Sequence, residues 1–168
     1  KSFKSKAETQ QVYFPYLLKE YRNRWFLICK PKKGTVLITL ALDRILEIEE
    51  MAKSGFVPYE GIDFERYFED TIGVTKTSRD RGQRVILEID AYNAPYVETK
   101  PIHPSQQILK KREDGSIIIR IDVVLNFELE REILGFGENI KVISPPRLKN
   151  FIKRRLEKSL ANYENNYI

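Results

Sequence analysis

Few side chains in this sequence are of the types that do chemistry. There is one cysteine, Cys29, and one histidine, His103. One of each excludes an internal disulfide, a structural zinc site built from Cys and His, and a His-rich metal centre. His103 lies between two prolines, and Ser105 lacks a Gly-x-Ser-x-Gly setting, so we expect a structural histidine. Cys29 sits in an aromatic stretch, which is typical of an inert buried thiol.

Motifs for enzymatic chemistry are also missing. The sequence contains no phosphate-cradling glycine loop, no HExxH and no paired-carboxylate motif. We therefore predict a protein that is not an enzyme, with no catalytic residues, no metal and no cofactor.

Basic residues gather at the two ends of the chain. Residues 1–33 hold nine Lys and Arg against two acids, and residues 147–168 hold six against two. Residues 34–146 hold fourteen against twenty, so the net charge of +5 hides two basic ends around an acidic middle. Clustered positive charge attracts phosphates, although solvated basic faces are common on any protein. Composition alone therefore leaves an anionic partner and a solvated surface both open.

Seven residues near the N-terminus are candidate contacts for an anionic ligand with aromatic parts. Arginine and lysine bind phosphates, and aromatic rings stack on bases. Three of the residues also have a structural alternative. Trp25 is typical of a barrel core, and Arg22 and Arg24 are typical of the solvated tip of a tight turn. The set is Tyr16, Arg22, Arg24, Trp25, Lys32, Lys33 and Arg44.

Arg44 is the strongest candidate because of its register. Alternation along residues 36–48 places it on the apolar face, between Leu42 and Leu46. A buried guanidinium without a partner is very costly. Either a bend near Asp43 turns Arg44 outward, with a structural salt bridge as one form of that bend, or Arg44 points into a polar mouth and meets an anion.

The first fifty residues have the pattern of short strands joined by tight turns. Residues 12–21 and 25–30 are rich in aromatic and β-branched residues, with Arg22-Asn23-Arg24 as the connection. A turn at 31–34 precedes the alternating stretch at 36–48. This pattern predicts a small curled sheet or barrel.

Residues 52–83 read as a connector. Asp63 is placed to cap a short helix with Phe64, Tyr67 and Phe68 on one face, and Gly73 is placed to end it. Residues 76–83 are polar and charged, which marks a domain boundary.

The second half mixes α and β patterns. A strand begins at residue 84, a short helix is expected at 93–99, and two strands at 106–112 and 116–124 flank the turn Glu113-Asp114-Gly115. Asn126 caps a helix that Gly135 ends, a strand follows at 141–143, and Ser144-Pro145 opens a last helix. This βαββαβ order predicts a ferredoxin-like sandwich with an added helix, so the whole chain is predicted to be α+β.

Several short motifs now stand in a recognisable order. They are Pro15-Tyr16-Leu17, Trp25-Phe26-Leu27, Leu42-Asp43-Arg44-Ile45, Ile72-Gly73-Val74, the run Pro101 to Gln106, the Asp114-Gly115 turn and Pro145. In this order and spacing the chain resembles the WYL-domain family of bacterial transcriptional regulators. The second half resembles the C-terminal extension, called WCX, that accompanies many WYL domains.

The resemblance implies a specific domain organisation. Residues 1–51 correspond to the WYL domain, an Sm/SH3-like barrel, with a complete or a truncated first strand as the two alternatives. Residues 52–83 are the connector and residues 84–168 the WCX extension. An N-terminal helix-turn-helix that binds DNA is expected outside this chain, in keeping with the absence of a methionine at residue 1. No signal peptide is visible, so a cytoplasmic protein is expected.

The resemblance also implies a function. The WYL barrel of the family is thought to sense a nucleic-acid or nucleotide-like ligand, and both parts take part in homodimerisation, with no membrane role. Two residues depart from the pattern: Phe26 replaces a tyrosine, and Ile38 stands where many members have an arginine. We therefore keep two hypotheses: an effector-sensing and dimerisation region, or an interaction module that has lost its ligand site.

Overall fold

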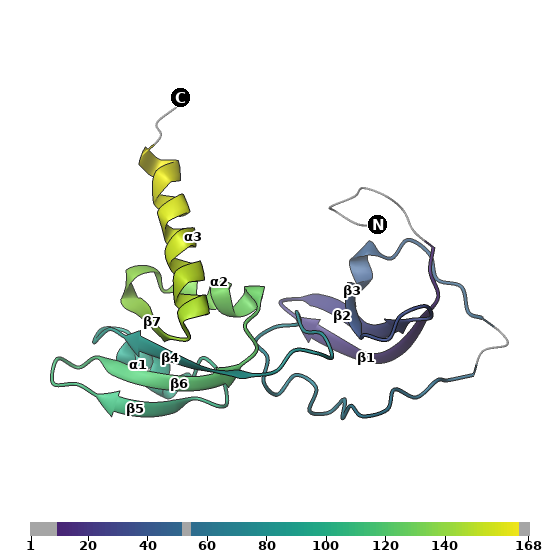
Figure 1. Ribbon diagram of the computed structural model, residues 1–168, viewed down its shortest axis with the longest axis horizontal. Coiled ribbons are helices and arrows are strands. Elements are labelled where there is room, and N and C mark those ends of the chain that lie inside the picture. The colour runs from purple at the N-terminus through teal and green to yellow at the C-terminus, as the bar shows by residue number, and fades with distance from the viewer. Residues whose placement is uncertain (1–9, 52–54, 165–168) are drawn as a thin grey trace. The chain divides into compact units, whose positions relative to one another are not determined.

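A computed structural model of the chain describes residues 10–51 and 55–164 (Figure 1). The fold is α+β, with a three-stranded and a four-stranded sheet, both antiparallel. The chain divides into two compact units, residues 1–80 and 81–168. No helix among the described residues is both long and apolar enough to cross a membrane.

The first unit is built on a hairpin with a third strand. Strands β1 (Tyr13–Tyr21), β2 (Arg24–Pro31) and β3 (Ile38–Ala41) are hydrogen-bonded in the order β1-β2-β3. Arg22 and Asn23 form the β1–β2 turn with φ angles of 53° and 60°. Two left-handed residues in a two-residue turn match the right-handed twist of the strands they join. The tight connection predicted at residues 22–24 is confirmed.

The predicted strand at residues 36–48 is wrong in its second half. Strand β3 ends at Ala41, a 3-10 turn η1 (Leu42–Arg44) follows, and residues 45–51 belong to no helix or strand. The last pair of the ladder joins Phe26 to Ala41, and β2 itself begins at Arg24. Beyond Ala41, β2 therefore has almost no residues left to pair, and the chain that follows has no neighbouring backbone for a strand ladder.

Residues 59–74 cover one face of this sheet. Tyr67 is buried with Ile28 of β2 and Leu37 at the heart of the unit. The helix predicted at residues 63–73 is instead a series of turns, in which Asp63 Oδ1 accepts a hydrogen bond from the Glu65 N–H. Lys76 Nζ donates to the Tyr67 carbonyl at 2.6 Å, so a side chain satisfies backbone that a helix would otherwise pair.

The second unit is a four-stranded sheet with three helices. Its strands are hydrogen-bonded in the order β5-β6-β4-β7, and every neighbouring pair is antiparallel. The elements are β4 (Gln83–Ile89), α1 (Ala94–Thr99), β5 (Gln107–Lys111), β6 (Ile117–Val123), α2 (Phe127–Gly135), the 3-10 turn η2 (Gly137–Asn139), β7 (Ile140–Ser144) and α3 (Pro146–Glu164). The predicted sequence of strands and helices is confirmed here.

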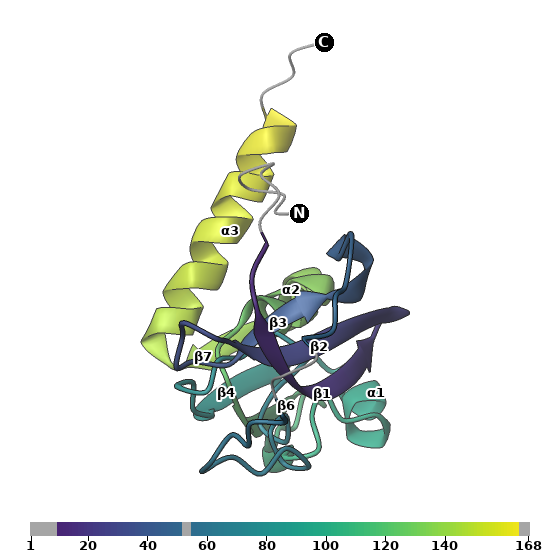
Figure 2. The ribbon, with the colours of Figure 1, turned by 90° about the vertical axis from the view of Figure 1, so that its right-hand side faces the viewer.

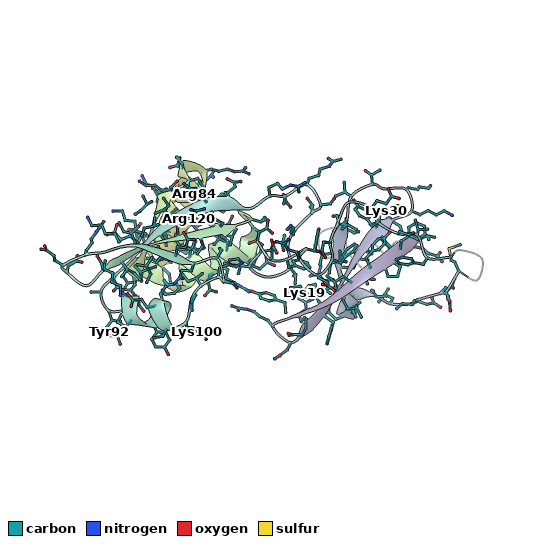
Figure 3. All side chains as sticks on the ribbon, turned by 90° about the horizontal axis from the view of Figure 1, so that it is seen from below. Lys19, Lys30, Arg84, Tyr92, Lys100 and Arg120 are labelled. Carbon is teal, nitrogen blue, oxygen red and sulfur yellow. The ribbon has the colours of Figure 1, made fainter. Side chains whose placement is uncertain are left out.

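Alternation along the strands sets the two faces of this sheet. One face is fully buried and is made by Val85, Leu87, Ile89, Ile117, Ile119, Ile121 and Val123. Arg84 and Arg120 have the opposite parity. Figure 3 shows both arginines on the side of the sheet away from α1, near whose ends Tyr92 and Lys100 lie.

Local signals place the helix ends. Asn126 Oδ1 accepts a hydrogen bond from the Leu129 N–H at 2.9 Å, and α2 ends at Gly135, as predicted. Helix α3 begins at Pro146, one residue later than predicted, because Ser144 still belongs to β7. Leu148 and Ile152 are buried, whereas the C-terminal half of α3 extends away from the sheet (Figures 1 and 2).

Candidate functional site

Four of the seven candidate residues lie at one end of the first sheet, which we call the hairpin end (Arg22, Arg24, Trp25 and Arg44). Arg24 Nη2 donates to both carboxylate oxygens of Asp43, at 2.9 and 2.8 Å. This hydrogen bond, together with the charges of Arg24 and Arg44, holds the pKa of Asp43 below its ordinary value. Arg44 therefore belongs to the same electrostatic cluster as the ion pair.

The register question at Arg44 is decided by the 3-10 turn. A bend at Leu42–Arg44 takes the residue out of strand geometry and leaves it exposed. The first of the two alternatives, a bend near Asp43, is therefore the one observed, and the ion pair with Asp43 is made by Arg24. An exposed guanidinium in this position is accessible to an anion from solvent.

Trp25 and Arg24 occupy opposite faces of the sheet, since side chains alternate along β2. The Arg24 guanidinium lies 5.5 Å from the centre of the Phe26 ring on its own face. Trp25 pairs with Glu20 across the hairpin and is 53% exposed, which is more open than a core residue. The hairpin end thus offers cations on one face and an open indole ring on the other.

Tyr16 lies in the aromatic core of the first unit. Its ring stacks on Phe64 at 5.3 Å and meets Tyr59 edge-on at 5.6 Å. Its hydroxyl oxygen is buried and has no hydrogen-bond partner among the described residues, and burial raises its pKa. A buried hydroxyl without a partner is uncommon and calls for an explanation, of which a bound polar group is one.

Lys32 and Lys33 lie at the other end of β2. The strand between them and the hairpin end is eight residues long, or roughly 25 Å at about 3.3 Å per residue. Both lysines are exposed in the turn, where the Lys32 N–H donates to the Val12 carbonyl at 2.8 Å. The seven candidates therefore fall into three places: the hairpin end, the distant turn and the aromatic core.

Two lysines of the hairpin that are outside the seven-residue candidate set lie over aromatic rings. Sequence reasoning counted Lys30 only as part of the basic segment from Arg22 to Lys33 and missed Lys19. Lys19 Nζ lies 4.8 Å from the Phe68 ring centre, and Lys30 Nζ lies 5.3 Å from that of Phe14. Lys19 pairs with Phe26 and Lys30 with Phe14 across the hairpin, so the alternation of β2 places both lysines on the face of Arg24. The repeated cation–aromatic pairing across the strands was the signal that would have found them.

The two departures from the family pattern lie in this sheet. Phe26, where the family has a tyrosine, supplies the ring beneath the Arg24 guanidinium. Ile38 pairs with Cys29 and is half-buried. An apolar side chain at this position adds no positive charge to the seven candidate residues.

His103 and Ser105 form a hydrogen-bonded pair in the second unit. The His103 ring is buried, and its Nδ1 lies 2.8 Å from Ser105 Oγ. That same oxygen accepts a hydrogen bond from the Asp122 N–H at 2.9 Å. The bond to Asp122 ties the loop to β6, and the bond to Ser105 fixes the His103 ring within it, which favours the structural role predicted for His103. No group of three or more potential metal ligands occurs among residues 10–51 and 55–164.

The fold and site define an α+β protein with two antiparallel sheets, the first carrying cations beside aromatic rings. Residues 81–160 match the family model of the WCX domain. This match confirms the resemblance predicted for the second half of the chain.

Other comparisons add little. No curated protein matches the chain. Among solved structures, the chain is similar to proteasome accessory factor B/C (PafBC) of Arthrobacter aurescens, with 17% sequence identity and a TM-score of 0.44. The match covers 99% of this chain and 25% of that protein, so the chain spans about a quarter of its length.

Proposed function

We propose that this chain is the effector-sensing and dimerisation region of a bacterial transcription regulator of the WYL class. The observation that carries this proposal is the match of residues 81–160 to the WCX domain. A helix-turn-helix outside this chain would then bind DNA, while the two units described here would sense the effector and form the dimer. No catalytic step belongs to this role.

The topology supports the finer fold assignment. A strand order of β7-β4-β6-β5, with α1 after β4 and α2 after β6, is the order expected of a ferredoxin-like domain, to which α3 is added. The meander of β1, β2 and β3 over a covered core is compatible with a small Sm/SH3-like barrel.

The ligand we propose for the first unit is single-stranded nucleic acid or a nucleotide. Support comes from the hairpin end, where Arg24 and Arg44 belong to one electrostatic cluster and Trp25 is exposed on the face opposite Arg24, and from Lys19 and Lys30 on the same face as Arg24. Cations that track phosphates, interleaved with rings that stack on bases, are the usual composition of such surfaces.

Trp25 provides the experiment, since it is the only tryptophan and lies at the hairpin end. We expect a single-stranded oligonucleotide to change its fluorescence at low salt and less so at higher salt, because binding to phosphates releases counterions. Arg44→Ala should weaken binding several-fold and reduce the salt dependence by about one charge. Lys141→Ala is the matched control, an exposed cation of the second unit.

Two results would contradict the ligand assignment. One is no fluorescence change or binding at low salt. The other is full affinity in the Arg44→Ala variant. In either case the WCX match would still support a regulator, but one whose first unit binds something else.

A second candidate function is an interaction module without a ligand site. It is favoured by Asp43, which already neutralises Arg24, and by the exposed apolar residues Leu156 and Leu160 on α3. Light scattering distinguishes it. A dimer that ignores a panel of nucleotides and oligonucleotides, and dissociates when Leu160 is replaced by Glu, would favour the interaction module.

A further inference from the structure

An aromatic and basic stripe runs along α1, far in sequence from the hairpin end. Tyr92 is 88% exposed and Tyr96 74% exposed. Tyr96 lies on the helix, Tyr92 directly precedes its N-cap Asn93, and Lys100 is its C-cap residue. Figure 3 shows Tyr92 and Lys100 on the outer side of α1, away from the sheet.

The helix that carries this stripe is firmly anchored. Ala94 and Val97 point inward and are each 2% exposed. Gln106 Nε2 donates to the Val97 carbonyl at 2.8 Å, and Lys111 Nζ of β5 bonds Glu98 at 2.9 Å. Two large aromatic rings are therefore held in water on a fixed platform, which is not what core packing requires.

The acids near this stripe are held by hydrogen bonds or by an ion pair. Asp90 accepts hydrogen bonds from both the backbone and side-chain N–H groups of Asn93, and Glu98 is paired with Lys111. Lys100 has no ion pair among the residues that the structure describes. The charges of Asp90, Glu98, Lys100 and Lys111 sum to zero, and the unpaired Lys100 stands at the end of the tyrosine row.

We propose that Tyr92, Tyr96 and Lys100 form a second contact for single-stranded nucleic acid, on the WCX-like unit itself. Bases stack on the exposed faces of the two tyrosines, and Lys100 holds the phosphate beside them. This inference extends the nucleic-acid ligand of the proposed function to a surface that the WCX match does not assign.

The chemistry favours a nucleic acid over a protein partner. A tyrosine that anchors a protein interface fills a pocket and is ringed by apolar contacts that exclude water. Here the exposed neighbours are Pro95, Thr99 and Lys100, and neither ring contacts another aromatic ring of the described chain. A base needs only an accessible ring face and a nearby cation, and both are present.

The test uses the full chain and a fluorescent single-stranded oligothymidylate. We expect the double variant Tyr92→Ala, Tyr96→Ala to lose at least about tenfold in affinity by anisotropy, because stacking on two rings is removed. Tyr92→Phe with Tyr96→Phe should keep the affinity, since phenyl rings also stack. Tyr163→Ala is the control, another strongly exposed tyrosine, on α3.

Photo-crosslinking separates this contact from the hairpin end. An oligonucleotide containing bromodeoxyuridine should crosslink to the peptide that carries Tyr92 and Tyr96, as located by mass spectrometry, and should still do so in the Arg44→Ala variant. Full affinity in the double alanine variant, or no crosslink to that peptide, would overturn the inference while leaving binding at the hairpin end intact.

Two further outcomes are decisive. If the oligonucleotide binds nowhere, both this inference and the ligand part of the proposed function fail. If the double alanine variant instead changes the mass found by light scattering, the tyrosines join copies of the chain, and the nucleic-acid assignment is wrong.

Discussion

Arg24 and Asp43 form an ion pair, with nitrogen and oxygen 2.8 Å apart, between the start of β2 and the 3-10 turn after β3. The two residues are 19 positions apart in sequence. Both side chains are largely exposed, so the pair adds little to stability. The consequence of the pair is electrostatic, because Asp43 neutralises Arg24, one of the cations that a phosphate at the hairpin end would contact.

Asp43→Asn should therefore tighten oligonucleotide binding. The change removes the negative charge that pairs with Arg24 and lies beside Arg44, so the local net charge rises by one. We expect a several-fold gain in affinity at low salt, which shrinks as the salt concentration is raised. Fluorescence titration of Trp25 measures it. Glu69→Gln is the control, since Glu69 pairs with Arg66 elsewhere in the same unit. Unchanged affinity in Asp43→Asn would place the ligand away from Arg24.

Alkaline pH should weaken the first unit. Burial raises the pKa of Cys29 to about 11 and that of Tyr67 to about 12. Raised folded-state pKa values mean that stability is fully present below the ordinary pKa values of these groups, 9.0 and 10.0, and is lost as pH rises through the folded values. Urea midpoints followed by Trp25 fluorescence should fall between pH 9 and 11.

A Tyr67→Phe variant sharpens the alkaline test. The Tyr67 hydroxyl is buried without a hydrogen-bond partner among the described residues, so its removal should cost no stability at pH 7. The variant should also lose less stability at high pH than the parent chain. An equal loss in the two proteins would show that Tyr67 does not contribute to the alkaline transition.

Ser105→Ala should destabilise the second unit. The change removes the hydroxyl beside His103 Nδ1, which keeps the Ser105 N–H as a donor, and takes away the acceptor of the Asp122 N–H. We expect a loss of about 1–3 kcal/mol in the free energy of unfolding. Circular dichroism in urea measures it, with exposed Ser159→Ala as the control. A neutral result would mean that water replaces the hydroxyl without cost.

Asn126→Ala should weaken the start of α2. The Asn126 side chain accepts from the Leu129 N–H, one of the unpaired donors of the first turn. Loss of this cap costs about 1 kcal/mol. Asn126→Asp keeps an accepting oxygen and should restore most of the stability. Equal losses in both variants would assign the effect to something other than the cap.

The fold of the second unit was predicted closely from local sequence patterns. Ile117, Ile119 and Ile121 alternate with Arg120, and all three isoleucines are buried as their parity requires. Gly115 adopts a φ of 85° in the hairpin turn, a conformation that favours glycine. These are short-range signals, in which neighbours along the chain already determine which face of a strand is buried and where the chain turns.

The fold of the first unit was predicted less well from the sequence, because it depends on pairing between residues that are distant along the chain. The alternation through Leu46 and Ile48 predicts a continued strand, yet both side chains are exposed and lie outside any strand. A strand needs a neighbour, and β2 begins at Arg24, only two residues beyond the pair of Phe26 with Ala41. Phe64, Tyr67 and Phe68 share a helical spacing but pack against the sheet as turns.

Composition and spacing by themselves determined the basic N-terminal segment, the aromatic residues within it and the α+β pattern, because these depend on residue type and local periodicity. The resemblance of the second half to a WCX extension was carried by its short motifs. Only the tertiary structure decided that Arg24 is neutralised by Asp43, that Tyr16 is in the core, and that Lys32 and Lys33 lie at the far end of the sheet. The reason is geometric: a strand separates its two ends by its full length, and charges act only over the distances that folding leaves between them.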